Sequence, residues 1–260
     1  MKKIVFFDID GTIYQYGNGV PKDTRWAIRK LRENGNIAMI CTGRTKSMIF
    51  PEILDIGFDG IIAGAGTYIE YQGREIFRDE MEEAIARDII STMRTLDIMA
   101  IPEGIDYIYF DKEYMPKEYF PIFEIYLKEV GKNVIEVDKA SKIEVSKVSG
   151  IVKNKEEVRK MEEKYPDYKV VDHKDGFIEI IPRGFSKAEG IKKVIDNIGL
   201  DRKDTYAFGD GMNDYEMLKY VNYGVVMGNA MDSFKSQIEY VTEDYDKGGI
   251  KNALERFGLI

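Results

Sequence analysis

Short runs of apolar residues alternate with amphipathic segments near both ends of the chain. Apolar runs that stop abruptly are typical of buried strands, and apolar residues spaced three or four positions apart are typical of helices. This alternation predicts a mostly parallel sheet with helices on both of its faces. The predicted strands are 4–7, 37–41, 60–63, 205–208, 223–227 and 240–242, and the predicted helices are 21–34, 46–54, 186–198 and 249–257.

The middle of the chain, from about residue 82 to residue 183, has a different pattern. Lys174, Asp175 and Gly176 form a turn signal between two apolar runs, which predicts a hairpin. Strands and helices clustered in this way are typical of an α+β module with an antiparallel sheet. The predicted strands are 107–110, 142–152, 168–172 and 177–181, and the predicted helices are 82–96, 119–130 and 156–165.

Composition narrows the class of protein. The 260 residues include 46 acidic and 38 basic side chains, which give a net charge of −8. No basic surplus is available to offset phosphate charge, so we do not expect a nucleic-acid partner. A single cysteine, Cys41, excludes an internal disulfide. No apolar stretch approaches the ~18 residues that span a bilayer, so we expect no membrane association and a cytoplasmic location.

Two carboxylates end the first predicted strand. Strand residues two positions apart point to the same side, so Asp8 and Asp10 leave the strand tip together, and Gly11 lets the chain turn away. Adjacent acids are costly unless a proton or a cation neutralises them. A hard cation with oxygen ligands, Mg²⁺, is the natural partner.

Polar groups also follow other predicted strands of the parallel sheet. Ligands bind at the carboxyl ends of such strands, where the sequence puts Thr42 and Gly43, and later Asp210 and Asp214. Lys187 lies in the first turn of a capped helix, where backbone N–H groups already favour an anion. Carboxylates for Mg²⁺, with a lysine and backbone amides for anionic oxygens, are what phosphoryl transfer requires.

Four segments of the chain, taken in sequence order, resemble the motifs of the haloacid dehalogenase superfamily of phosphatases, and specifically of its Cof-type subfamily IIB with a C2B cap. The resemblance implies a Rossmann-like α/β core, residues 1–81 and 184–260, with an inserted α+β cap domain, residues 82–183, that closes over the site. Segment 172–183 is the best candidate for substrate choice. The matching segments are Phe7–Thr12, Cys41–Arg44, Lys187 and Gly209–Asp214.

The resemblance also implies a role for each carboxylate. Asp8 would be the nucleophile that forms an aspartyl-phosphate, and Asp10 would be the general acid and then the general base. Asp8, the Asp10 backbone carbonyl and Asp210 would bind Mg²⁺. Asp214 would support the metal through water or a hydrogen bond.

The remaining site residues would bind the phosphate. Thr42, the Gly43 amide and Lys187 would hold the phosphoryl oxygens, and Asn213 would contact the phosphate or orient Lys187. The family implies a Mg²⁺-dependent phosphatase of a small phosphorylated metabolite, with sugar phosphates as the expected class. We expect a monomer or a weak homodimer.

Other interpretations of these residues stay open. Taken singly, Asp-x-Asp can be a turn, Lys187 a solvated lysine, and the pair Asp210 and Asp214 a helix cap. A phosphomutase of the phosphomannomutase type would form the same aspartyl-phosphate but would retain its substrate. A metabolite-binding protein without activity would have no need of Asp10 as a proton donor.

Overall fold

The computed structural model describes residues 2–173 and 176–260, and these residues form two compact units. Unit 1 consists of Met1–Gly43, Pro51–Arg78 and Ser186–Ile260, and unit 2 of Arg44–Phe50 and Asp79–Phe185. The polypeptide therefore passes between the units after residues 43, 50, 78 and 185. The core and cap boundaries expected from the sequence stay a prediction, and they do not include the short segment Arg44–Phe50 in the cap.

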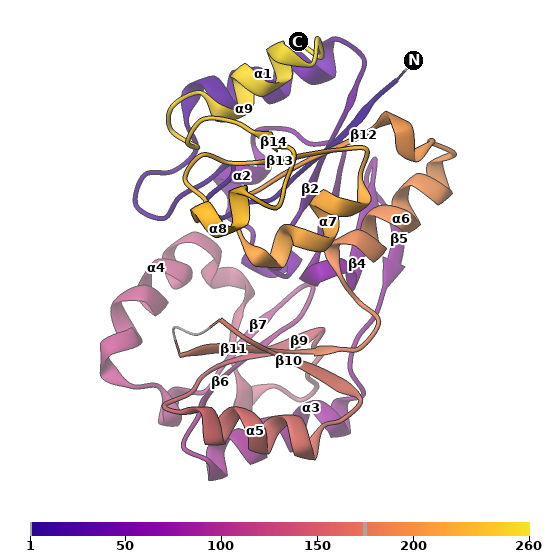
Figure 1. Ribbon diagram of the computed structural model, residues 1–260. Coiled ribbons are helices and arrows are strands. Elements are labelled where there is room, and N and C mark those ends of the chain that lie inside the picture. The colour runs from indigo at the N-terminus through magenta and orange to yellow at the C-terminus, as the bar shows by residue number, and fades with distance from the viewer. Residues whose placement is uncertain (1, 174–175) are drawn as a thin grey trace. The chain divides into compact units, whose positions relative to one another are not determined.

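Unit 1 is built on a sheet in which the described strands have the order β14-β13-β12-β1-β2-β3-β4-β5 (Figure 1). The six strands from β14 to β3 are parallel, whereas β4 and β5 are antiparallel additions at one edge. The strands are β1 (Ile4–Phe7), β2 (Ile37–Cys41), β3 (Gly60–Ala63), β4 (Tyr68–Tyr71), β5 (Arg74–Arg78), β12 (Thr205–Gly209), β13 (Tyr223–Val226) and β14 (Tyr240–Val241).

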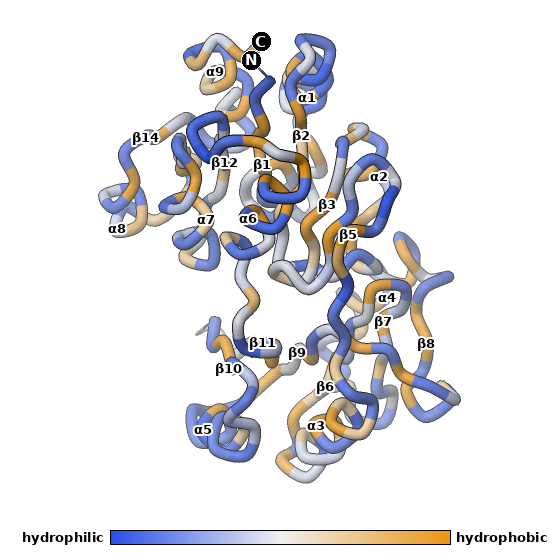
Figure 2. The backbone as a smooth tube through the Cα atoms, turned by 90° about the vertical axis from the view of Figure 1, so that its right-hand side faces the viewer, coloured by the Kyte–Doolittle hydropathy of each residue, from blue (hydrophilic) through white to orange (hydrophobic). Residues whose placement is uncertain are grey.

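Helices cover both faces of this sheet, as the alternating pattern predicts. The helices are α1 (Lys22–Glu33), α2 (Pro51–Leu54), α6 (Lys187–Ile198), α7 (Tyr215–Tyr220), α8 (Asp232–Lys235) and α9 (Gly249–Arg256). Ile4 and Phe6 of β1 share a buried cluster with Ile191 and Val194 of α6, on the face that α7 and α8 also cover. Helices α1 and α9 lie side by side on the other face, and both chain ends lie near them (Figures 1 and 2).

Two local features of the first eighty residues differ from the sequence prediction. The predicted helix 46–54 is a 3₁₀ turn, Lys46–Met48, followed by α2, which begins at Pro51. Proline has no N–H to donate and is tolerated only in the first turn of a helix, so it starts a second helix. The hairpin β4–β5, with Gln72 and Gly73 between its strands, was not predicted.

Unit 2 contains a second sheet, whose described strands have the order β10-β11-β9-β6-β7-β8. All neighbouring pairs are antiparallel except β7 with β8, which supports the predicted α+β character. The strands are β6 (Met99–Glu103), β7 (Ile108–Phe110), β8 (Val134–Glu136), β9 (Lys147–Ile151), β10 (Tyr168–Asp172) and β11 (Phe177–Pro182), and the helices are α3 (Glu83–Thr95), α4 (Phe120–Val130) and α5 (Lys155–Lys164).

The hairpin predicted around Lys174–Gly176 is present as the antiparallel pair β10–β11, although Lys174 and Asp175 themselves lie outside the described residues. The predicted strand 142–152 is shorter than expected and begins at Lys147. Before it, the Ile143 N–H donates to Glu83 and the Glu144 N–H to Tyr109, so these residues bond to side chains instead of a neighbouring strand.

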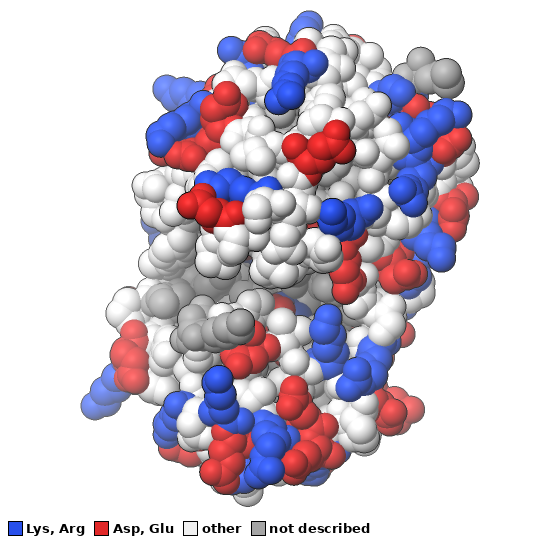
Figure 3. Space-filling view, viewed as in Figure 1, with Lys and Arg blue, Asp and Glu red and all other residues white. Residues whose placement is uncertain are grey.

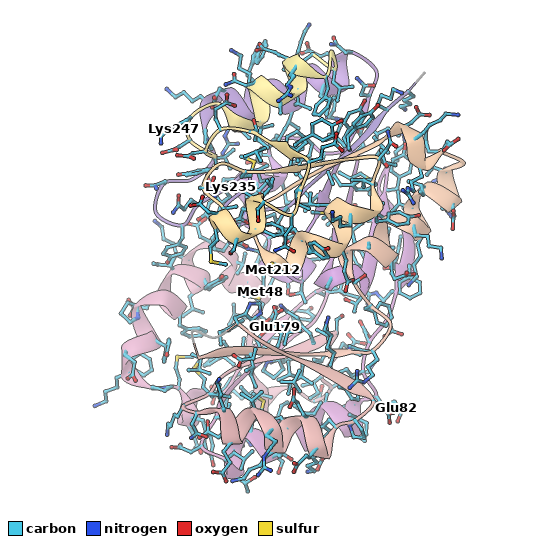
Figure 4. The ribbon with its side chains drawn as sticks, viewed as in Figure 1. Met48, Glu82, Glu179, Met212, Lys235 and Lys247 are labelled. Carbon is cyan, nitrogen blue, oxygen red and sulfur yellow. The ribbon has the colours of Figure 1, made fainter. Side chains whose placement is uncertain are left out.

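The two faces of the second sheet differ in chemistry. Helices α3 and α5 cover one face with apolar residues, among them Ile89, Met93 and Met161. On the other face Glu103 and Lys147 are buried and ion-paired at 3.4 Å. Ser149 and Thr45 join this polar network by donating to Glu103. Glu179, labelled in Figure 4, pairs with Lys147, and the His173 ring lies 3.2 Å from Glu179.

Segment Arg44–Phe50 is fixed within unit 2 by specific contacts. The buried Ser47 hydroxyl donates to the Gly104 carbonyl at 2.7 Å, and Thr45 donates to Glu103 at 3.2 Å. The Phe50 ring meets the Tyr126 ring edge to face at 5.2 Å.

Surface charge and helix length bear on the expected partners. On the face drawn in Figure 3, acidic and basic side chains are intermixed. No helix within residues 2–173 and 176–260 combines the length and the apolar character that crossing a bilayer demands.

Candidate active site

Asp8 lies at the carboxyl end of β1, in the middle of the parallel sheet of unit 1. Its backbone N–H donates to the Phe208 carbonyl of β12 at 3.0 Å, which extends the pairing by one residue. Side chains alternate along a strand, so Asp8 continues the face of Ile4 and Phe6, which α6 covers. The side chain is therefore directed to the α6 face and is only 3% exposed.

Lys187 begins α6, and its position depends on a close approach of two backbone segments. Ser186 precedes the helix and caps it by accepting the Glu189 N–H. Gly66, in the 3₁₀ turn Gly64–Gly66 after β3, has a φ of 99°, and a Cβ there would lie 2.8 Å from the Ser186 carbonyl. Only glycine permits both this conformation and this contact. The glycine-rich loop thus brings the start of α6 against the end of β3.

Lys187 joins two carboxylates. Its ammonium donates to Asp8 Oδ1 and to Asp214 Oδ1, each at 2.5 Å, and all three side chains are buried. The other Asp214 oxygen accepts the backbone N–H groups of Asp210 and Gly211 at 3.0 and 3.1 Å. Both carboxylate oxygens of Asp214 thus accept hydrogen bonds, and Asp214 connects Lys187 to the loop that carries Asp210.

Three carboxylates lie close enough to share one ion. Oxygens of Asp8, Asp210 and Asp214 all lie within 4.8 Å of one another. Gly11 permits this arrangement, because a Cβ at Gly11 would lie 2.1 Å from Asp210 Oδ2. Oxygen ligands at this spacing fit a hard divalent cation, for which three carboxylates are a suitable donor set.

Protonation of the cluster reflects its burial and its crowding. Burial raises the pKa of Asp8 well above its usual value, Asp214 adds to the rise, and Lys187 opposes it. Burial also raises the pKa of Asp210 to about 7, again with help from Asp214. Burial alone would lower the pKa of Lys187, but Asp214 and Asp8 outweigh it, so its pKa is raised and the ammonium stays charged. With all its carboxylates ionised the cluster would carry more negative charge than Lys187 balances, so it favours binding of protons or of a divalent cation.

The remaining predicted residues surround this cluster at the same edge of the sheet. Thr42 is buried and follows β2, the strand next to β1, and its carbonyl accepts the Ala65 N–H at 3.0 Å. Asp10 is exposed. Gly43, also in unit 1, is partly exposed. Thr42 and Asp10 therefore flank Asp8 from the neighbouring strand and from its own turn.

Asn213 lies on the loop that carries Asp210 and Asp214, and both roles expected for it stay predictions. It is exposed, and its Oδ1 lies above Gly211, where a Cβ would come within 2.5 Å. Asp8 and Asp214 are the partners that orient Lys187. The role of Asn213 in phosphate binding stays a prediction.

Sequence reasoning missed Asn229, which follows β13 at the same edge of the sheet. Its amide donates to the Gly11 carbonyl at 2.9 Å, beside the cluster. The available signal was the pair Gly228 and Asn229 directly after a buried strand, which is the pattern of glycine and polar residue that marked the other strand ends.

Comparisons with known proteins agree with this geometry. A family profile described as haloacid dehalogenase-like hydrolase matches residues 5–254. A Bacillus subtilis protein named "Putative phosphatase YkrA" is 30% identical over 99% of this chain and 98% of its own. A solved structure of a hypothetical protein from Geobacillus kaustophilus HTA426 matches over 100% of both chains with 30% identity and a TM-score of 0.86.

A further solved structure is described as the subclass IIB sugar phosphatase BT4131 of the same superfamily. It covers 100% of both chains with 26% identity and a TM-score of 0.85. The matched span, residues 5–254, contains the carboxylates and the lysine that lie at one edge of the sheet, namely Asp8, Asp10, Lys187, Asp210 and Asp214. The chain belongs to the haloacid dehalogenase-like hydrolases.

Proposed function

We propose that this protein is a Mg²⁺-dependent phosphatase that hydrolyses small phosphorylated metabolites, with sugar phosphates as the preferred class, through an aspartyl-phosphate on Asp8. The observation that carries the proposal is the contact of Asp8 with Lys187 at 2.5 Å beside the carboxylates of Asp210 and Asp214. A nucleophilic carboxylate, a fixed cation and a site for a divalent ion together meet the needs of phosphoryl transfer.

In the first half of the reaction, an Asp8 carboxylate oxygen attacks phosphorus and forms the new P–O bond. The bond from phosphorus to the ester oxygen breaks, and Asp10 gives its proton to the departing alkoxide. The exposure of Asp10 suits a group that must meet the leaving group. Lys187 neutralises charge on the phosphoryl oxygens, with the Thr42 hydroxyl and the Gly43 amide as further donors.

In the second half, Asp10 takes a proton from water, whose oxygen attacks phosphorus. The bond to Asp8 breaks, inorganic phosphate leaves, and Asp8 returns as a carboxylate. The Lys187 ammonium opposes the rise in the pKa of Asp8, and it therefore favours the ionised form that the next cycle needs.

Phosphatases of this family generally use a divalent metal ion. In this chain Asp8, the Asp10 backbone carbonyl and Asp210 would hold Mg²⁺, with Asp214 in support. When bound, the ion would neutralise charge on the transferring phosphoryl group. The raised pKa values of Asp8 and Asp210 support this assignment, because both carboxylates need a positive partner to be ionised together.

The substrate class rests on likeness to the subclass IIB sugar phosphatase. We also propose a cytoplasmic protein that is a monomer or a weak homodimer and binds neither nucleic acid nor membranes; the net charge of −8 supports the lack of nucleic-acid binding. Segment 172–183, which contributes the partly buried Glu179 to the polar network around Lys147, stays the best candidate for substrate choice.

A phosphate-release screen tests the proposal. The purified protein is mixed with a panel of sugar phosphates, nucleotides and cofactor phosphates, with Mg²⁺ or with excess chelator. We expect Mg²⁺-dependent release, restored when the ion is returned, and a loss of at least about a thousandfold in Asp8→Asn.

Asp204→Asn is the matched control for Asp8→Asn. Asp204 is also a buried aspartate with a lysine at 2.5 Å, Lys3, but it lies before β12, at the opposite edge of the sheet. Undiminished hydrolysis by Asp8→Asn would reject Asp8 as the nucleophile.

Isomerised monophosphate from a hexose bisphosphate, without free phosphate, would identify a mutase, and tight binding without turnover would identify a binding protein.

A further inference from the structure

Asn229 lies in the loop after β13 and forms two hydrogen bonds to distant segments. Its side-chain nitrogen donates to the Gly11 carbonyl at 2.9 Å, and its side-chain oxygen accepts the Tyr245 N–H at 2.9 Å. Gly11 belongs to the turn after β1, and Tyr245 belongs to the loop after β14. One amide group therefore connects three loops at the carboxyl ends of the strands.

These connections reach across the strand that carries Asp210. In the sheet, β12 lies between β1 and β13, so β1 and β13 do not touch. Asp210 directly follows β12, and its Oδ2 would be 2.1 Å from a Cβ at Gly11. The hydrogen bond from Asn229 to Gly11 thus spans the end of β12 and holds the Gly11 turn against the Asp210 carboxylate.

The loop that presents Asn229 is itself fixed on both sides. Met227 N–H donates to the Gly209 carbonyl, and Gly228 N–H donates to the Glu243 carbonyl, each at 3.0 Å. Lys235, labelled in Figure 4 and part of α8, donates its ammonium to the Gly228 carbonyl at 3.0 Å. A fixed donor can hold its acceptor in place, whereas a mobile one would follow it.

We propose that Asn229 is a positioning residue for the cation site: it sets the separation between the turn after β1, which carries Asp10 and Gly11, and the loop that carries Asp210. The inference rests on the proposed function, because it concerns the ion that these carboxylates would bind. Groups that orient metal ligands commonly change metal affinity or activity by 10–100-fold when they are removed. Asn229 itself is exposed, so its loss should change the whole fold little.

Two substitutions at Asn229 separate its hydrogen bonds. Asn229→Ala removes both bonds, whereas Asn229→Asp keeps an acceptor for the Tyr245 N–H but removes the donor to the Gly11 carbonyl. The new negative charge in Asn229→Asp would by itself strengthen Mg²⁺ binding. Weaker binding in Asn229→Asp would therefore result from the lost donor.

Asn34→Ala is the matched control. Asn34 is also an exposed asparagine whose amide donates to a distant carbonyl, that of Leu259, at 3.1 Å. Asn34 precedes β2, at the edge of the sheet opposite the carboxylates. It therefore reports what the loss of one asparagine-to-carbonyl bond does to the fold alone.

The experiment measures the rise in melting temperature as Mg²⁺ is added, and it needs no substrate. We expect the half-saturating Mg²⁺ concentration to rise about tenfold in Asn229→Ala and Asn229→Asp and to be unchanged in Asn34→Ala. In phosphate release at saturating Mg²⁺, kcat should fall about tenfold with little change in KM, since the ligands, and not substrate binding, are displaced.

Wild-type half-saturation by Mg²⁺ in both Asn229 variants would overturn the inference, even if they melted at lower temperature. A wild-type protein that Mg²⁺ stabilises but that releases no phosphate from any compound would reject the proposed function alone. In that case the Mg²⁺ titration still decides whether Asn229 positions the cation site.

Discussion

Asp210 is a partly buried carboxylate beside two other carboxylates, Asp8 and Asp214, and we propose it as a cation ligand. Burial and the neighbouring Asp214 raise its pKa from 3.8 to about 7. The folded chain therefore binds more protons at Asp210 than the unfolded chain does between these two pH values. Linkage then requires that the unfolding free energy of the metal-free protein falls as pH rises through this interval.

Replacing Asp210 by asparagine tests this dependence. In excess chelator, Asp210→Asn should gain stability relative to wild type when the pH is raised from 5 to 8, by roughly 1–3 kcal/mol. At pH 5 the wild-type carboxyl is largely protonated, so the variant mimics it. At pH 8 only the wild type carries the additional negative charge of Asp210 in the acidic cluster, with no bound cation to balance it. Urea unfolding at the two pH values measures the change.

Adding Mg²⁺ should reverse the order of stability at pH 8, because the ion stabilises the ionised carboxylate that the variant lacks. Asp204→Asn serves as the control, because Asp204 pairs with Lys3 away from the cluster. A stability difference between wild type and Asp210→Asn that is the same at pH 5 and pH 8 would contradict the raised pKa.

Single residues were predictable from the sequence where chemistry and chain position coincided. Asp8, Asp210 and Asp214 each follow the end of a buried apolar run closely, and strand ends of a parallel sheet meet at one edge. The structure brings these three together with Lys187. Asn229 was not predictable as a partner of Gly11, because hydrogen bonds between distant loops leave no periodic signal in one sequence.

At the scale of elements, the position of α6 depends on how closely glycine lets the chain approach it. Gly66 packs on the Ser186 carbonyl, and Gly190, one turn into the helix, would place a Cβ 2.6 Å from Ile62. The helix can therefore lie directly on the end of β3, and Lys187 in its first turn reaches Asp8.

Gly66→Ala tests this dependence of the helix on its neighbour. A Cβ in the left-handed region costs about 1–2 kcal/mol, and the contact with the Ser186 carbonyl adds further strain. We expect lower stability and, because the start of α6 must shift, a fall of about tenfold or more in the rate of phosphate release. Urea unfolding and initial rates measure the two effects.

Gly35→Ala separates the backbone effect from the contact. Gly35 has a φ of 84°, but a Cβ there would meet nothing within 4 Å. This variant should lose only the backbone contribution to stability and keep the wild-type rate. Equal effects of the two substitutions on the rate would mean that Gly66 does not determine where α6 begins.

Most elements were predictable because their apolar spacing is regular and their ends carry capping or breaking residues, as at Ser186 and Gly199 around α6. Strand β6 was missed, and it contains Pro102, which lacks an N–H. It pairs with β9 along its length but with β7 only at Glu103 and Ile108. Strand β9 was predicted too long, because neighbouring side chains bind the N–H groups just before it.

At the scale of the whole molecule, unit 2 is discontinuous in sequence. Segment Arg44–Phe50 follows directly after Thr42 and Gly43, yet its contacts belong to unit 2. This membership was not predictable from the pattern of the chain, because the segment's polar partners, Glu103 and the Gly104 carbonyl, lie more than fifty residues away.

Ser47→Ala tests whether the segment is an integral part of unit 2. The Gly104 carbonyl is buried and would lose its Ser47 donor, so we expect a loss of about 1–3 kcal/mol in unfolding free energy. Ser236→Ala, which removes an exposed bond from a serine to the Ser233 carbonyl, should cost less. Equal losses in urea unfolding would indicate that Ser47 contributes no more than a surface hydroxyl.

The discontinuity has a practical consequence for exchanging domains between relatives. A chimera that imports residues 79–185 from another protein would leave the host residues 44–50 facing foreign partners at Glu103 and Gly104. Transplanting both stretches together would preserve the matched pairs. Experiments that exchange this domain among these hydrolases should therefore transfer the seven residues after Gly43 together with residues 79–185.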